Sequence, residues 1–392
     1  MPSASANTLT NMIPQLFAAM DIVSRELIGF IPAVTRDSRV DRVAINQSVN
    51  VPVVGTITPV TITPANVSPD TGAMAPGNVA ITISNQYAAP VAWGGDEQVV
   101  ATEAGLYDSV QTQRFAQGFR AIANLVEADL AALHAKCSRG YGTYNVQPFG
   151  TAADLSDMAQ AIKILDDNGA PADRHAVFGS SAIANIRGKQ SVLFKVNEAG
   201  TSDMLRRGII GDIMGVAVHN SAQVKSAVAS GGATNATIGT AAYAVGATAL
   251  TLASAGANAI AAGDMFTIAT DANIYVCTSS TATNVGAGGV VTIAQPGLRQ
   301  AITGSTSPAI TMIGTTDRNM VFSRSAIVLA TRTPYMPKEG DQAADVRDIV
   351  DPVSGLAFQI ALYKQYRQVH VEIGLAWGCQ MVAPRHSMIL MG

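Results

Sequence analysis

The chain has 392 residues, a formal net charge of −3 and only 14% charged residues, against about 25% in an average domain. Its length suffices for a substantial core and roughly two or three domains. The weak net charge argues against tight binding to nucleic acid or an anionic membrane. The three cysteines are widely separated and include no C-x-x-C pair, which predicts neither a zinc site nor a disulfide framework.

Residues 10–30 carry one apolar face with helical spacing. Its members are Ile13, Phe17, Met20, Val23 and Leu27. The face predicts a helix that either belongs to the core or forms an N-terminal arm on a neighbouring subunit, and the pattern leaves both open. No positive segment precedes Arg25, so we expect no secretory signal, no membrane partner and a protein made in a reducing cytoplasm.

Residues 43–93 switch to a period of two, the pattern of β-strands. Prolines recur there, and because proline cannot donate to a strand ladder, these strands cannot lie in the centre of a sheet. We predict a long two-stranded ribbon with its tip near 68–77. An isolated ribbon is marginally stable, so we expect it to rest on another copy of the chain; an ordinary exposed hairpin is the alternative. The candidate inter-subunit contacts are Phe17, Met20, Val51, Val53, Val60, Ile62, Val79, Ile81, Ile83 and Trp93.

Residues 103–136 predict a long helix, about 50 Å at 1.5 Å per residue. Its apolar stripe is Leu106, Val110, Phe115, Phe119, Ile122, Val126, Leu130 and Leu133. The opposite, polar side is expected to carry Arg114, Arg120, Glu127 and Asp129. Gly118 is a mild weakness in this pattern, because glycine lowers helix stability.

An α/β segment follows, with a helix over 155–165 that ends at Asn168-Gly169, a short strand at 176–178 and a helix over 182–187. Residues 208–224 predict a strand and a turn. After an interruption, strands resume over 319–331 and 356–377, and the sequence closes with an apolar tail at 388–391.

The interruption, residues 226–312, contains only three charged residues, Asp264, Asp271 and Arg299. It is built from Ala, Gly, Thr, Ser and Val, with short alternating runs such as 249–252 and 290–293. This composition predicts a compact β module inserted into an α/β host. The charge-free run 227–263 is too rich in Gly, Ser, Thr and Asn to span a membrane.

Four sequence patterns resemble catalytic or ligand-binding motifs, and each has a simpler structural interpretation. His370 and Glu372 have the H-x-E spacing of zinc deaminases, but the required P-C-x-x-C is missing. His175 and His219 lie beside apolar strands without an obvious carboxylate or cysteine companion nearby in sequence, so we interpret them as structural. Ser180-Ser181 lacks the G-x-S-x-G of a nucleophile elbow.

The fourth pattern, the glycine-rich run 286–289, lacks the lysine of a phosphate loop. We therefore expect no enzyme activity, no catalytic residues, no cofactor and no metal site.

The order of arm, proline-rich β-loop, long helix and α/β domain resembles the major capsid proteins of tailed bacteriophages, which share the Hong Kong ninety-seven fold. The inserted module narrows the resemblance to coat proteins like that of phage P-twenty-two. Similar segments are Gly208–Ser221 before the module, Gly263–Ala269 and Val291–Arg299 within it, and Asn319–Arg332 with Pro334 after it.

The resemblance implies an α+β capsid fold with an inserted β-barrel. The implied parts are an N-terminal arm (1–42), the E-loop hairpin and start of the peripheral domain (43–95), the spine helix and peripheral domain (96–150), the axial domain (151–225 and 313–392, the latter with the C-terminal strands) and the barrel (226–312). It further implies an icosahedral shell of hexamers and pentamers that is assembled in the bacterial cytoplasm and encloses double-stranded DNA.

The implied partners are copies of the chain itself, a scaffolding protein, a portal protein and DNA held by non-specific contacts, with a decoration protein as a further candidate. Some shells of this family crosslink through an E-loop lysine, but residues 37–95 contain no lysine, so we expect a non-covalent shell. No long scaffolding segment precedes the arm, which predicts a separate scaffolding protein. The alternatives are an encapsulin-type compartment and a secreted β-rich surface protein.

Overall fold

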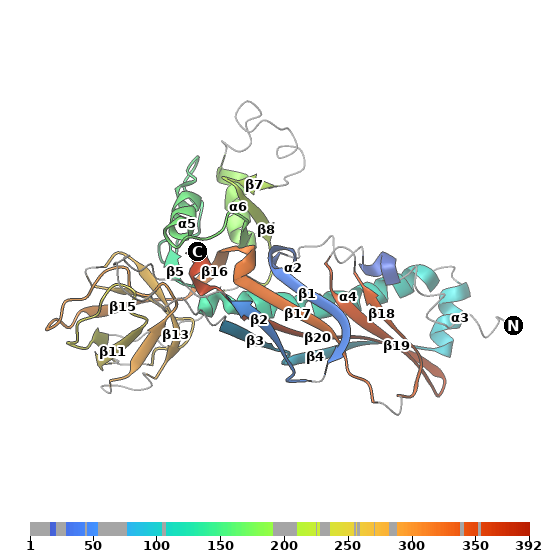
Figure 1. Ribbon diagram of the computed structural model, residues 1–392. Coiled ribbons are helices and arrows are strands. Elements are labelled where there is room, and N and C mark those ends of the chain that lie inside the picture. The colour runs from blue at the N-terminus through green and yellow to red at the C-terminus, as the bar shows by residue number, and fades with distance from the viewer. Residues whose placement is uncertain are drawn as a thin grey trace, which may run out of the picture.

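The computed structural model describes most of the chain and places it in an elongated molecule (Figure 1). A β-barrel forms one end, a six-stranded sheet with a long helix forms the other, and an α/β layer lies between them. The described residues are 16–20, 29–43, 45–53, 77–103, 107–190, 210–224, 226–227, 236–254, 256, 259–269, 271–281, 288–337, 341–351 and 354–392.

The long helix is α4 (Tyr107–Ala132), which passes into the 3-10 turn η1 (Leu133–Lys136). This confirms the predicted helix, with a later start and an α-helical length of about 39 Å at 1.5 Å per residue. The predicted stripe is buried from Phe115 to Leu133. Gly118 has a packing reason, because a Cβ at this position would lie 3.1 Å from Ile373 Cδ1, so glycine lets the helix approach the sheet closely.

The six-stranded sheet has the order β1-β17-β20-β19-β18, and β4 pairs with the other edge of β20. Helix α4 packs on one face, where its side chains meet inward residues of β19 and β20. Phe119 and Phe358 form an edge-to-face pair with ring centroids 4.9 Å apart. The strands are β1 (Thr35–Val43), β4 (Asn85–Gly94), β17 (Ile327–Pro334), β18 (Ala343–Val350), β19 (Ala357–Gln365) and β20 (Gln368–Met381).

The central layer is a mixed sheet with the order β5-β21-β16-β6-β8-β7, to which β9 adds at β16. Helices α5 (Ser156–Asp167) and α6 (Ser180–Lys189) pack their apolar residues into its core. The predicted apolar tail is strand β21, fully buried between β5 and β16. The strands are β5 (Arg139–Tyr141), β6 (Arg174–Phe178), β7 (Asp212–Ile213), β8 (Val216–Asn220), β9 (Ser226–Ala227), β16 (Thr316–Ser323) and β21 (Ser387–Met391).

The inserted module is a closed antiparallel barrel, because its strands run β12-β15-β10-β11-β14-β13 and β13 pairs back to β12. Its core is separate from the rest of the molecule, and β13 also pairs with β5, which joins the barrel to the central layer. The strands are β10 (Ala236–Ile238), β11 (Ala249–Ser254), β12 (Met265–Ile268), β13 (Ile274–Ser280), β14 (Val290–Ile293) and β15 (Ala309–Ile313).

The expected α+β fold with an inserted β-barrel is therefore confirmed. The predicted strands and helices around 155–187, 208–224, 319–331 and 356–377 are confirmed as well. Short helical elements complete the fold: α2 (Phe30–Ala33), α3 (Gly95–Glu103), η3 (Arg324–Ala326) and η4 (Pro384–His386).

Candidate assembly surfaces

The hairpin of β2 (Ser48–Val53) and β3 (Gly77–Thr82) is a separate two-stranded sheet within the described residues. Val49 lies opposite Ile81 and Val51 opposite Val79, so these side chains share one face of the hairpin. Along this face, Ile81 is buried and the valines are half-buried, whereas the even-numbered residues of both strands are exposed. The hairpin is thus apolar on one side and polar on the other.

The root of the hairpin packs on the face of the six-stranded sheet opposite to α4. Ile81 meets Val328 and Ala330 of β17, and Ile83 meets Ala376 of β20. The neighbouring residues of both strands point to the helix side, as alternation along a strand requires. Ile81 and Ile83 are 1% and 0% exposed. These two candidate contacts are therefore core residues of their own chain.

Gly378 of β20 sets how closely the hairpin root approaches the sheet. A Cβ at this position would overlap the carbonyl oxygen of Thr82 and would lie 3.1 Å from Ile83 Cα. The root is further fixed by backbone hydrogen bonds, since Asn46 N donates to Ile83 O at 2.8 Å and Ile83 N donates to Gln47 O at 2.9 Å. The last strand of the ribbon predicted over 43–93, β4, belongs instead to the six-stranded sheet, and residues 68–76 of the predicted tip lie outside the described residues.

The other nominated residues divide into four groups. Met20 and Trp93 are 2% and 4% exposed, and Trp93 packs edge-to-face on Phe115 with ring centroids 6.1 Å apart. Phe17 is 42% exposed, in a short helical segment whose Leu16 and Met20 are buried. Val51, Val53 and Val79 are half-buried, while Val60 and Ile62 lie outside the described residues. Val51 also packs beside Ile81 on β17, so Phe17, Val53 and Val79 remain the candidates for contact with another chain.

Glu127 corrects the prediction that it lies on an outward polar side of the long helix, because it is only 2% exposed. Its carboxylate accepts the backbone N–H groups of Phe30 at 3.0 Å and Ile31 at 2.8 Å, and the hydroxyl of Ser221 at 2.9 Å. Burial raises the pKa of Glu127 despite these hydrogen bonds. Helix α4 contacts protein on more than one side, and Glu127 ties it to α2 and to the end of β8.

Asp129, also predicted on the polar side, joins α4 to two strands of the six-stranded sheet. Its Oδ2 accepts a hydrogen bond from Trp377 Nε1 at 2.7 Å and from Asn85 Nδ2 at 2.6 Å. Both acidic residues therefore orient helix α4 against its surroundings. A one-dimensional helical pattern does not distinguish such buried acceptors from solvated carboxylates.

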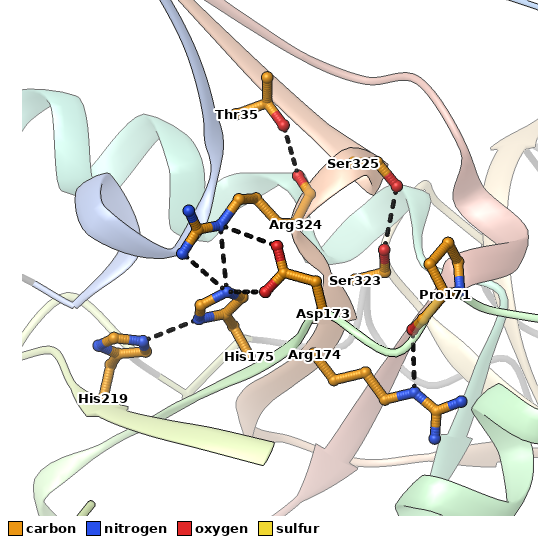
Figure 2. A network of polar contacts seen from close by, with 9 residues as sticks. All are labelled: Thr35, Pro171, Asp173, Arg174, His175, His219, Ser323, Arg324 and Ser325. Carbon is orange, nitrogen blue, oxygen red and sulfur yellow. Dashed lines mark hydrogen bonds and ion pairs between the residues drawn. The ribbon is translucent and has the colours of Figure 1, made fainter. Parts of the chain in front are cut away.

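His175 and His219 lie together on adjacent parallel strands, β6 and β8 (Figure 2). His175 Nδ1 is 3.0 Å from His219 Nε2, and His175 Nε2 is 3.0 Å from Asp173 Oδ1. Arg324 Nε lies 3.3 Å from the other oxygen of Asp173. The prediction that no carboxylate companion is nearby was wrong, because Asp173 precedes His175 by two residues. Burial, followed by the neighbouring His175 and Arg324, lowers the pKa of His219 to about 4.

Two further chemical patterns form no reactive arrangement among the described residues, and residues 286–287 of the glycine-rich run lie outside them. His370 pairs with Tyr363 across β19 and β20, with ring centroids 6.0 Å apart. Ser180 and Ser181 are exposed at the start of α6. Among the described residues, no group of three or more His, Cys, Asp or Glu side chains is arranged to hold a metal ion.

The three cysteines are free, and burial raises the pKa of each thiol to about 12. Such thiols are poor nucleophiles at neutral pH, because the thiolate is the reactive form. Within the described part of the chain, no helix combines the length and apolar character needed to cross a membrane.

No family model and no curated protein matches the sequence. Solved structures do match the fold. A structure from Mycobacterium phage Che8 has 13% identity and a TM-score of 0.43, over 88% of this chain and 84% of the other. The capsid of Ralstonia phage GP4 has 10% identity and a TM-score of 0.43, over 92% and 86%. A virus-like particle from Pyrococcus furiosus has 7% identity and a TM-score of 0.42, over 96% and 98%.

Proposed function

We propose that this chain is the major capsid protein of a tailed bacteriophage and that its copies assemble into an icosahedral shell around double-stranded DNA. The carrying observation is the β2–β3 hairpin, which rests on the sheet at its root, where Val51 packs beside Ile81, and presents half-buried Val53 and Val79 further out. Exposed apolar surface of this kind favours contact with another chain. The order of hairpin, long helix, mixed sheet and inserted barrel supports the same function.

Rigid attachment of the hairpin root is consistent with this role. Gly378 and the buried Ile81 and Ile83 fix its direction, so the outer valines are held in place before a neighbour binds. Preorganisation of this kind lowers the entropy cost of association. In a closed symmetric shell, every copy repeats the contact, and many modest contacts add up to a stable particle.

The shell is expected to be non-covalent and to enclose nucleic acid. Electron microscopy of particles purified from infected cells should show closed shells, and boiling them in detergent should release monomers rather than a ladder of linked chains. Double-stranded DNA extracted from particles made during infection supports a virus, whereas an enzyme cargo in place of DNA would indicate an encapsulin-type compartment.

Hexamers and pentamers, a separate scaffolding protein and a portal protein belong to the same proposal, as does assembly in the bacterial cytoplasm. Expression of this chain alone should give few or irregular particles, and co-expression with its scaffolding protein should give uniform shells. Uniform closed shells from the chain alone would contradict the need for a scaffold.

A further inference from the structure

Three arginines among the described residues are almost fully buried, and one of them differs from the others. Arg139 donates to Asn273 Oδ1 at 3.0 Å, and Arg332 donates to Asp37 Oδ2 at 2.9 Å. Arg318 is 3% exposed, yet none of its three guanidinium nitrogens has a hydrogen-bond partner in the described structure. A buried charge without a partner is costly, so this guanidinium is suited to an acceptor from outside the chain.

Arg318 faces a cavity of about 180 Å³ between the end of α4 and the segment around β9. Three alanines of the helix, Ala128, Ala131 and Ala132, and the side chain of Val224 form apolar walls. This volume corresponds to about six water molecules at about 30 Å³ each. The cavity therefore accommodates a small group that has one polar end and a short apolar body.

The charge around the cavity favours a monoanion. Burial lowers the pKa of Arg318 to about 10, so the side chain is cationic at neutral pH. Burial also lowers the pKa of His134, which keeps that imidazole neutral there. Asp264 already contributes negative charge near Arg318, and the C-terminal end of a helix disfavours anions. Asp264 and the helix end repel a dianion such as phosphate, and a single arginine neutralises only one of its two charges. One carboxylate carries one negative charge and fits the planar fork of one guanidinium.

We propose that this cavity, the Arg318 pocket, binds one short aliphatic carboxylate. The carboxylate binds the free guanidinium nitrogens, and its methylene groups lie against the alanines of α4. The carboxylate is either a free small molecule or a Glu or Asp side chain from another polypeptide. Both sources share this chemistry and are separated by the experiment below.

The test measures the thermal unfolding midpoint of the purified, unassembled full chain in sodium butyrate, with sodium phosphate and sodium chloride at matched ionic strength. Butyrate should raise the midpoint saturably, by about 2 °C at ten times its dissociation constant, and neither other salt should do so. Arg318→Met should abolish the shift. Arg187→Met, which removes an exposed charge at the end of α6, should retain it.

A butyrate effect that is absent, or equally large in Arg318→Met, would overturn the proposal. Should Arg318→Met fail to fold, Arg318→Lys keeps the charge but loses the fork and should weaken butyrate binding about tenfold; unchanged binding would also overturn it. Repeating the titration on assembled particles separates the sources. A retained response indicates a small-molecule ligand, and a response lost only on assembly indicates a polypeptide carboxylate. The first arm uses the unassembled chain, so its outcome is independent of the proposed function.

Discussion

At the scale of single residues, Glu127 shows how one buried carboxylate organises three segments. It receives the first N–H groups of α2 and the Ser221 hydroxyl, so its oxygens face only donors. In Glu127→Gln, an amide N–H₂ replaces one oxygen and faces donors instead. We expect the unfolding free energy to fall by about 1–3 kcal/mol, measured by urea denaturation. Glu103→Gln, at an exposed position, should leave it within about 0.5 kcal/mol; equal effects would contradict this role.

The histidine pair predicts a loss of stability in mild acid. Burial first, and the adjacent cations second, hold the pKa of His219 at about 4 in the folded chain, whereas an unfolded histidine titrates near about 6.5. The unfolded state therefore binds more protons between these values, so stability is complete above pH of about 6.5 and declines as the pH falls.

The expected loss from His219 between pH 7 and pH 5 is about 1 kcal/mol, after allowance for partial exposure. His219→Gln should flatten this decline in urea unfolding measured across the pH range. Asp173 and Asp212 oppose the shift of the pair, and Arg324 reinforces it. The same pH slope in wild type and variant would exclude the pair as the source.

At the scale of elements, the hairpin depends on a glycine in a different strand. Gly378→Ala would place a methyl group against the Thr82 carbonyl, so we expect the hairpin root to lift from β20. Faster hydrogen exchange at the Ile83 amide should report this change. Gly188→Ala is the matched control, because a Cβ there meets open space. Unchanged exchange in Gly378→Ala would show that the root adapts without moving.

Strongly periodic elements could be predicted from sequence. The stripe of α4, the alternation in the barrel and the apolar tail all follow local patterns whose period matches their structure. What could not be predicted depends on contacts distant in sequence. The helical pattern predicts that Glu127 is exposed to solvent, but α2 packs against it and buries it. The strand pattern leaves Ile81 and Ile83 free to contact another chain, but β17 and β20 of their own chain bury them. The sequence around Arg318 does not show that its guanidinium is buried without hydrogen-bond partners, because three segments that are distant in sequence surround it.

At the scale of the whole molecule, the three structural parts are joined by direct contacts. The six-stranded sheet, the central layer and the barrel are linked by α4 and by pairing of β13 with β5. Arg139 reinforces this junction through Asn273 of the barrel and Asn168 of the central layer. The barrel and the central layer are therefore joined both by backbone pairing and by side-chain hydrogen bonds.

Sedimentation velocity of two hairpin variants tests the central claim most directly. Val79→Asp places a charge on the apolar face, and Asn78→Asp places the same charge on the exposed polar face one residue away. The proposed function predicts that Val79→Asp, with an unchanged circular dichroism spectrum, remains a slowly sedimenting species under conditions in which wild type and Asn78→Asp form large particles. Equal assembly of both variants would contradict it.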